Sequence, residues 1–160
     1  MAIQSTMRWI AIVVSLVGMR VARADDGSRH LVYAEVLGKA GPYGIGYEYS
    51  VMPWIAIGAA VSYAVIGDER LTTTAPYVHV PLVGHHHHRL FGELGAIAAH
   101  RHIPSPVPDW SGSTHTGTAG FLSLGYEHVA KHVVIRASGS VVAGDGGLGP
   151  MVGISFGARP

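Results

Sequence analysis

The 160-residue chain contains no cysteine, so no disulfide framework can stabilise it. Charged residues make up only 13% of the chain, and no apolar run approaches the roughly 20 residues that a membrane-spanning helix needs. Its stability must therefore come from packing and from closure of the fold.

The N-terminus has the layout of a secretory signal peptide. Residues 1–8 carry one positive charge and no acid, residues 9–19 form an apolar run, and Ala22-Arg23-Ala24 is a small-x-small site. We therefore predict that residues 1–24 are a signal peptide cleaved after Ala24, because the apolar run is too short for a membrane anchor. The mature chain, residues 25–160, has a length typical of one domain.

Cleavage changes the charge of the chain. The signal peptide takes three arginines and no acid with it, which leaves eight Lys and Arg against ten Asp and Glu, a net charge of −2 with neutral histidines. A basic surface for nucleic acid is not supported by this balance. An exported chain with little charge and no helical span is compatible with a membrane β-barrel.

Two segments have the pattern of a β-hairpin. Residues 44–65, GIGYEYSVMPWIAIGAAVSYAV, alternate large apolar residues with small or acidic ones, and residues 50–53 form a turn between the two arms. Residues 125–141 repeat a Gly-Tyr-Glu start, a short turn and an alternating arm. A period of two residues indicates strands, and successive hairpins indicate an up-and-down meander.

The whole mature chain fits an all-β, eight-stranded antiparallel up-and-down β-barrel. Besides the hairpin arms, we predict strands over residues 31–38, 74–83, 89–100 and 149–157, and the first arm of the second hairpin belongs to a strand over residues 118–128. The second, fourth and sixth links are tight turns, whereas the other links include polar residues 67–73 and the Pro- and Ser-rich residues 101–116. Outer-membrane barrels show this asymmetry between their two ends.

The two faces of the strands distinguish a membrane barrel from a soluble one. One face carries Ile, Val, Leu and Tyr, and the other carries Gly, Ala, Ser and single glutamates. A soluble barrel has the opposite arrangement, with bulky aliphatic residues inside and charge outside. We therefore predict that the apolar faces point to lipid. The aromatic residues expected in interfacial girdles are Tyr43, Tyr47, Tyr49, Trp54, Tyr63, Tyr77 and Tyr126.

With these features the chain resembles small bacterial eight-stranded outer-membrane β-barrel proteins. The resemblance covers residues 31–156 and is carried by the alternating repeats, by Gly-Tyr-Glu at residues 46–48 and 125–127, and by the signal peptide. It implies an outer-membrane location, a monomer, and outer-membrane lipids and the assembly machinery as partners. Such proteins commonly end on an aromatic residue, whereas here Phe156 is followed by four more residues.

Several charged residues fall on the inward face of the predicted barrel. This interior polar set is Glu35, Glu48, Glu93, Glu127 and Arg136. Charges inside a narrow barrel must be paired or hydrated, and one arginine cannot neutralise four carboxylates, so Lys39 and His79 are further candidate partners. The set is either a network that locks a filled barrel or an ion or proton path.

Four consecutive histidines, His85 to His88, are predicted to form one of the tight turns. They are either a polar turn or a weak site for Zn, Ni or Cu, and His100, His102 and His115 near the longest link offer a second cluster of the same kind. We assign neither a metal nor a cofactor to the chain on this evidence.

We expect a non-enzymatic protein with a structural or surface-interaction role. One alternative is an outer-membrane lipid-modifying hydrolase resembling lipid A deacylases, which use a histidine, a serine and an acid. The chain lacks their His-x-Ser strand motif, and Ser113, His115 and Asp109 fall in the predicted long loop. The other alternative is a soluble periplasmic ligand-binding β-barrel.

Overall fold

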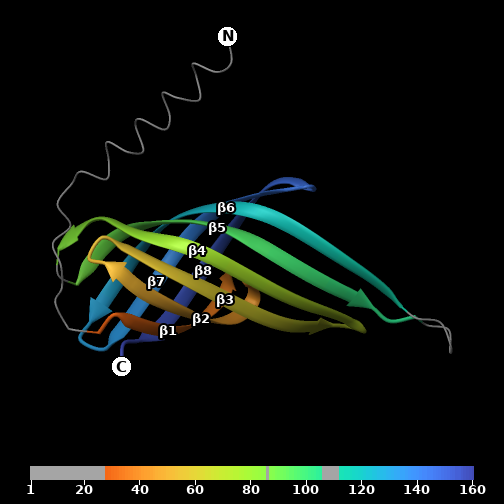
Figure 1. Ribbon diagram of the computed structural model, residues 1–160, viewed down its shortest axis with the longest axis horizontal. Coiled ribbons are helices and arrows are strands. Elements are labelled where there is room, and N and C mark those ends of the chain that lie inside the picture. Colours follow the sequence, from red (N-terminus) through yellow and green to blue (C-terminus); the bar gives the residue numbers. More distant parts are fainter. Residues whose placement is uncertain (1–27, 86, 106–111) are drawn as a thin grey trace, which may run out of the picture.

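The computed structural model describes residues 28–85, 87–105 and 112–160. They form eight strands: β1 (His30–Gly38), β2 (Gly41–Met52), β3 (Ile55–Ile66), β4 (Glu69–His85), β5 (His88–Ile103), β6 (Ser113–Ala130), β7 (Val133–Gly144) and β8 (Gly147–Ala158). Each strand pairs antiparallel with the next, and β1 pairs with β8 to close a barrel (Figure 1). The predicted all-β, eight-stranded up-and-down barrel is confirmed. The predicted signal peptide, residues 1–24, lies outside the described residues.

Alternation along each strand decides which side chains enter the barrel. On β3, the large side chains of Ile57 and Val61 are exposed on the outside, whereas the small side chains of Ala56 and Ala60 are buried inside. Successive residues of a strand point to opposite faces, so the whole pattern follows from one register. The narrow lumen accepts small residues, and the bulky aliphatic residues lie on the outer wall.

The two ends of the barrel differ. The terminal rim comprises the β2–β3, β4–β5 and β6–β7 turns, the start of β1 and the end of β8, and the distal rim comprises the other four connections. Three of the four distal connections are also tight turns of two residues. The expected asymmetry in link length therefore rests on the β5–β6 connection, residues 104–112, alone.

Strands β4, β5 and β6 are 17, 16 and 18 residues long, against 9 to 12 for the others. Residues 69–73, 101–103 and 113–116, which we expected to be in loops, therefore belong to strands. Threonines that favour strands pair here across the sheet, as in Thr72 with His100 and Thr114 with His102. These strands form a distal extension, residues 69–74, 99–103 and 113–117, that projects beyond β1, β2, β7 and β8 (Figure 1). Residues 61–66 of β3 accompany it, because they pair with residues 69–74.

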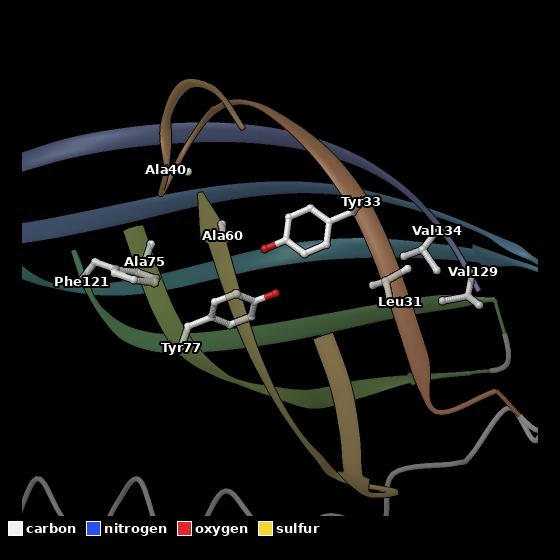
Figure 2. Packing of buried hydrophobic residues seen from close by; sticks show 9 residues of the cluster. All are labelled: Leu31, Tyr33, Ala40, Ala60, Ala75, Tyr77, Phe121, Val129 and Val134. Carbon is white, nitrogen blue, oxygen red and sulfur yellow. The ribbon is translucent and has the colours of Figure 1, made fainter. Parts of the chain in front are cut away.

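The interior also holds aromatic side chains. Tyr33, Tyr77, Phe91 and Phe121 are each at most 4% exposed. Figure 2 shows the rings of Tyr33 and Tyr77 inside the lumen, with their hydroxyls directed toward its middle. The assignment of Tyr77 to an outer aromatic girdle is therefore wrong, because its place in the alternation of β4 turns it inward, on the same face as His79.

The other predicted girdle aromatics lie on the outer wall, except Trp54, which is in the β2–β3 turn. Tyr43, Tyr47, Trp54, Tyr63 and Tyr126 are between 43% and 55% exposed, and Tyr49 is partly exposed. These side chains combine an apolar ring with a polar atom, a combination that suits the boundary between a hydrocarbon layer and water.

Candidate functional site

Arg136 on β7 is the centre of a charged network that crosses the lumen. Its Nη1 donates to Glu48 Oε2 at 2.8 Å and its Nη2 to Glu48 Oε1 at 3.0 Å, while its Nε donates to Glu127 Oε2 at 3.0 Å. All three side chains are at most 4% exposed. A guanidinium that binds one carboxylate with two parallel hydrogen bonds makes a strong and directional pair. Since β2 and β7 are not neighbours in the barrel, this pair connects opposite walls.

A second cation enters the lumen from the β1–β2 turn. Lys39 Nζ lies 2.9 Å from Glu93 Oε2 and 3.2 Å from Glu35 Oε1. The same ammonium lies 4.4 Å from the ring centroid of Tyr77 and 5.3 Å from that of Tyr33. Ion pairs and cation–π contacts together compensate the loss of water around this buried charge.

Two features of the backbone just before the β1–β2 turn are specific to this position: the conformation of Leu37 and the glycine at position 38. Leu37 has a φ of 59°, a left-handed conformation that costs roughly 1 kcal/mol or more for a residue other than glycine. A Cβ on Gly38 would lie 2.0 Å from the carboxyl carbon of Glu35. Glycine at this position therefore leaves the space that the Glu35 side chain occupies.

His79 on β4 lies between the two ion-pair groups. Its Nδ1 is 3.3 Å from Glu93 Oε1 and 3.9 Å from Glu48 Oε2, and its Nε2 is 3.9 Å from Glu127 Oε2. The imidazole also packs against Phe91, with 4.9 Å between the ring centroids. One histidine thus contacts carboxylates from three strands.

The interior network, as we name this set, comprises Glu35, Lys39, Glu48, His79, Arg89, Glu93, Glu127 and Arg136. Arg89 joins it through its Nε, which lies 3.1 Å from Glu127 Oε1. Among these eight residues, four carboxylates face three permanent cations and one histidine. The charges balance when His79 is protonated, and one excess negative charge remains when it is neutral.

The structure places all five predicted interior residues in this network. Glu48 and Glu127 are joined through Arg136, and Glu35 and Glu93 are joined through Lys39. Arg89 is a second interior arginine that was not predicted from the sequence, where only Arg136 was expected inside. The alternation of Arg89, Phe91 and Glu93 with Leu90 and Leu94 contains the signal that would have placed Arg89 inside.

A cleft at the terminal rim leads to the interior network. This polar cleft is lined by Glu48, His79, Arg89 and Glu127 at its inner side and by residues of the β2–β3 turn. Deeper in the lumen, Tyr33, Tyr77 and Phe121 fill the space (Figure 2). This arrangement fits a filled barrel whose walls are held together by ion pairs.

Glu48, His79 and Glu93 each offer a ligand atom within 4.8 Å of the other two. A divalent cation at this position would compete with Arg136 for Glu48 and with Lys39 for Glu93. The positive charges already present at hydrogen-bonding distance therefore favour an ion-pair network over a metal site here.

The two histidine clusters that the sequence offered as metal sites are only partly brought together in the structure. His85 and His88 flank the β4–β5 turn, and His86 between them lies outside the described residues. His115 is opposite Arg101 in the β5–β6 ladder, so it lies on the other face from His100 and His102, and these three histidines do not form one cluster.

Two of the residues considered for catalysis also lie in a different element than predicted. Ser113 and His115 belong to the start of β6, and not to a loop as expected, while Asp109 lies outside the described residues. Inside the barrel, Ser123 contacts Ser140, with 2.6 Å between the two hydroxyl oxygens.

The fold is shared with solved bacterial barrels. The N-terminal β-barrel domain of OprF from Pseudomonas aeruginosa superposes with a TM-score of 0.56 at 18% identity, over 82% of this chain and 95% of that one. Ail, the attachment invasion locus protein of Yersinia pestis, gives a TM-score of 0.52 at 12% identity, over 81% of this chain and 91% of that one. A second structure of Ail, in complex with the heparin analogue sucrose octasulfate, gives 0.54 at 16% identity, over 81% and 94%.

Both neighbours are eight-stranded outer-membrane β-barrels, and the likeness confirms the closed barrel fold of this chain. No protein-family model and no curated protein sequence matches the chain. Within residues 28–85, 87–105 and 112–160, no helix has the length and apolar character needed to cross a membrane.

Proposed function

We propose that this protein is a monomeric outer-membrane β-barrel with a filled lumen and a non-enzymatic role in the structure or surface interactions of the envelope. It reaches the membrane through the signal peptide of residues 1–24 and the barrel assembly machinery. The observation that carries the proposal is the inverted distribution of side chains, with charge inside and aliphatic residues outside.

The outer wall is too apolar for contact with water. Ile45, Leu94, Leu122, Leu124 and Val152 are each more than 60% exposed. These side chains come from β2, β5, β6 and β8, so the apolar surface extends around the barrel. Monomeric soluble proteins rarely expose apolar patches larger than a few hundred Å², whereas a closed barrel in lipid requires such a wall.

The distal extension supports a surface role. A membrane-spanning strand needs about 9–11 residues, so β4, β5 and β6 each have several residues to spare. The outward side chains of the extension, such as Arg70, His100 and Thr116, are polar, unlike the aliphatic residues of the outer wall. We place this extension outside the cell and the terminal rim in the periplasm.

Two epitope insertions test this orientation with a matched control. One follows Gly146 in the β7–β8 turn of the distal rim, and the other follows Lys131 in the β6–β7 turn of the terminal rim. We expect antibody on intact cells to detect only the first insertion, and both after permeabilisation. Detection of the second insertion alone would reverse the orientation, and a soluble periplasmic product would contradict the membrane barrel.

Heating in SDS provides an independent check of closure. Protein from outer membranes is expected to migrate differently before and after boiling, because a closed barrel resists SDS until it is heated. Lipid A from cells that express the chain should keep its acyl chains. Loss of an acyl chain would favour the hydrolase over the non-enzymatic role.

A further inference from the structure

Three histidines lie in one row across neighbouring strands at the terminal rim. In the strand registers, His85 of β4 is directly opposite His88 of β5, and His88 is directly opposite His128 of β6. Directly opposite residues of antiparallel strands project to the same face, with their Cβ atoms about 5 Å apart. This row is on the outer face, where His85 and His88 are exposed and His128 is partly exposed.

Two of these imidazoles already have the spacing of metal ligands. Nδ1 of His88 is 3.4 Å from Nδ1 of His128, and the ring centroids are 4.7 Å apart. Zinc–nitrogen bonds of about 2.0–2.1 Å in tetrahedral geometry place two ligand nitrogens roughly 3.3–3.4 Å apart. The distance between the two nitrogens therefore matches that between two ligands of one ion, which would take the place of their present contact.

The surroundings of the pair add further potential ligands. The hydroxyl of Tyr126, two residues before His128 on the same face, contacts Nδ1 of His88. Nδ1 of His87 lies 2.7 Å from the carbonyl oxygen of Val129, and its ring is 6.4 Å from that of His128. A backbone carbonyl that accepts a hydrogen bond from one imidazole nitrogen orients the ring, as is usual around metal-binding histidines.

We propose that His88 and His128 form a surface site for a divalent transition metal, and that His85, opposite His88 in the ladder, turns toward them as a third ligand when the ion binds. Neutral imidazoles favour Cu²⁺, Ni²⁺ and Zn²⁺ over Mg²⁺ and Ca²⁺, which prefer oxygen ligands. Unlike the buried Glu48, His79 and Glu93, this pair contains no carboxylate that is already paired with a cation. The site does not depend on the proposed function, because it is defined by three strands of the barrel alone.

The test uses the full chain without an affinity tag, purified in detergent and freed of metal with EDTA. Zn²⁺ binding is measured by calorimetry, and Cu²⁺ coordination by electron paramagnetic resonance, which reports the number of bound nitrogens. We compare the wild type with the double variant His88→Asn/His128→Asn. The matched control is His100→Asn/His102→Asn, which removes two outward histidines from the distal extension.

We expect the wild type and the control to bind one Zn²⁺ per chain, and the double variant to bind it at least tenfold more weakly with loss of two coordinating nitrogens. His85→Asn alone should weaken binding less than the double variant does. A change in SDS mobility on boiling shows that each variant still folds, and the single variant His128→Asn serves in place of a double variant that does not. No Zn²⁺ binding by the wild type, or unchanged affinity and nitrogen coordination in the folded His128→Asn variant, would overturn the proposal.

Discussion

The two faces of β6 show opposite chemistry within a few residues. Leu122 and Leu124 on the outer face are more than 60% exposed, whereas Ser123 and Glu127 on the inner face are at most 3% exposed. In a soluble protein the leucines would be buried and the glutamate would be in water. The interior therefore contains polar side chains that contact one another, whereas the outer face of the same strand presents aliphatic side chains.

The largest loss of stability is expected when the interior loses its central cation, Arg136. Arg136→Met leaves the buried carboxylates of Glu48 and Glu127 without their shared partner, and breaking a buried ion pair in this way costs about 3–5 kcal/mol. We expect the free energy of unfolding, measured by guanidinium titration in lipid vesicles, to fall by this amount. Arg136→Lys should lose less, because it keeps the charge. Equal stability of Arg136→Met and wild type would show that the network does not hold the walls together.

The next largest loss of stability is expected when a charge is placed on the outer face. Leu124→Arg places a cation on the apolar wall, where a basic residue near the bilayer midplane costs about 2–4 kcal/mol. Leu148→Arg is the matched control, because Leu148 is on the same face but next to the distal turn. The cost near an interface is roughly 0–1 kcal/mol. Urea titration in vesicles should separate the two variants, and similar costs would argue against a membrane-embedded wall at Leu124.

A smaller effect is expected from filling space on the inner face. A Cβ added at Gly125 would lie 2.4 Å from Phe91 Cζ and 2.7 Å from the backbone oxygen of Ala137. Gly125→Ala should therefore destabilise the barrel by about 1–3 kcal/mol through overpacking. Gly139→Ala, on the outer face of the adjacent strand, meets no atom within 4 Å and is the control. If the thermal midpoints of the two variants agree, the interior is not tightly packed at this level.

The smallest effect is expected in the distal extension. Arg101 Nε donates to Glu69 Oε2 at 2.8 Å, and these side chains are 52% and 34% exposed. Glu69→Gln should change the free energy of unfolding by less than about 1 kcal/mol, because water and salt screen exposed pairs. A loss as large as that of Arg136→Met in the same titration would mean that the extension is part of the stabilising core.

The sequence predicted the barrel because strand periodicity is local. Alternation in residues 44–65 and 125–141 was enough to assign the strands and their faces, and the inward position of Glu48 and Arg136 followed from it. The contact between these two residues did not follow, because it joins positions 88 residues apart across the lumen. That contact depends on how the closed sheet is staggered, which no local pattern contains.

The errors have physical reasons as well. Residues 69–73, 101–103 and 113–116 look like loops because they are polar, but pairing among β4, β5 and β6 outweighs their composition. Tyr77 was placed on the outer wall because it is aromatic and β4 carries apolar residues on both faces. The alternation of β4 contained the correct answer, because Tyr77 shares a face with His79, a candidate interior residue.

We propose that the apolar face lies in lipid, and because the chain has no native cysteine, site-directed spin labelling can measure this directly. Single cysteines replace Leu122, Leu124 and Thr114, which share the outer face of β6, and each carries a nitroxide spin label in vesicles. We expect the labels at Leu122 and Leu124 to be relaxed by oxygen and protected from a water-soluble nickel reagent, and the label at Thr114 to show the reverse. High accessibility of Leu122 and Leu124 to the nickel reagent would contradict the account.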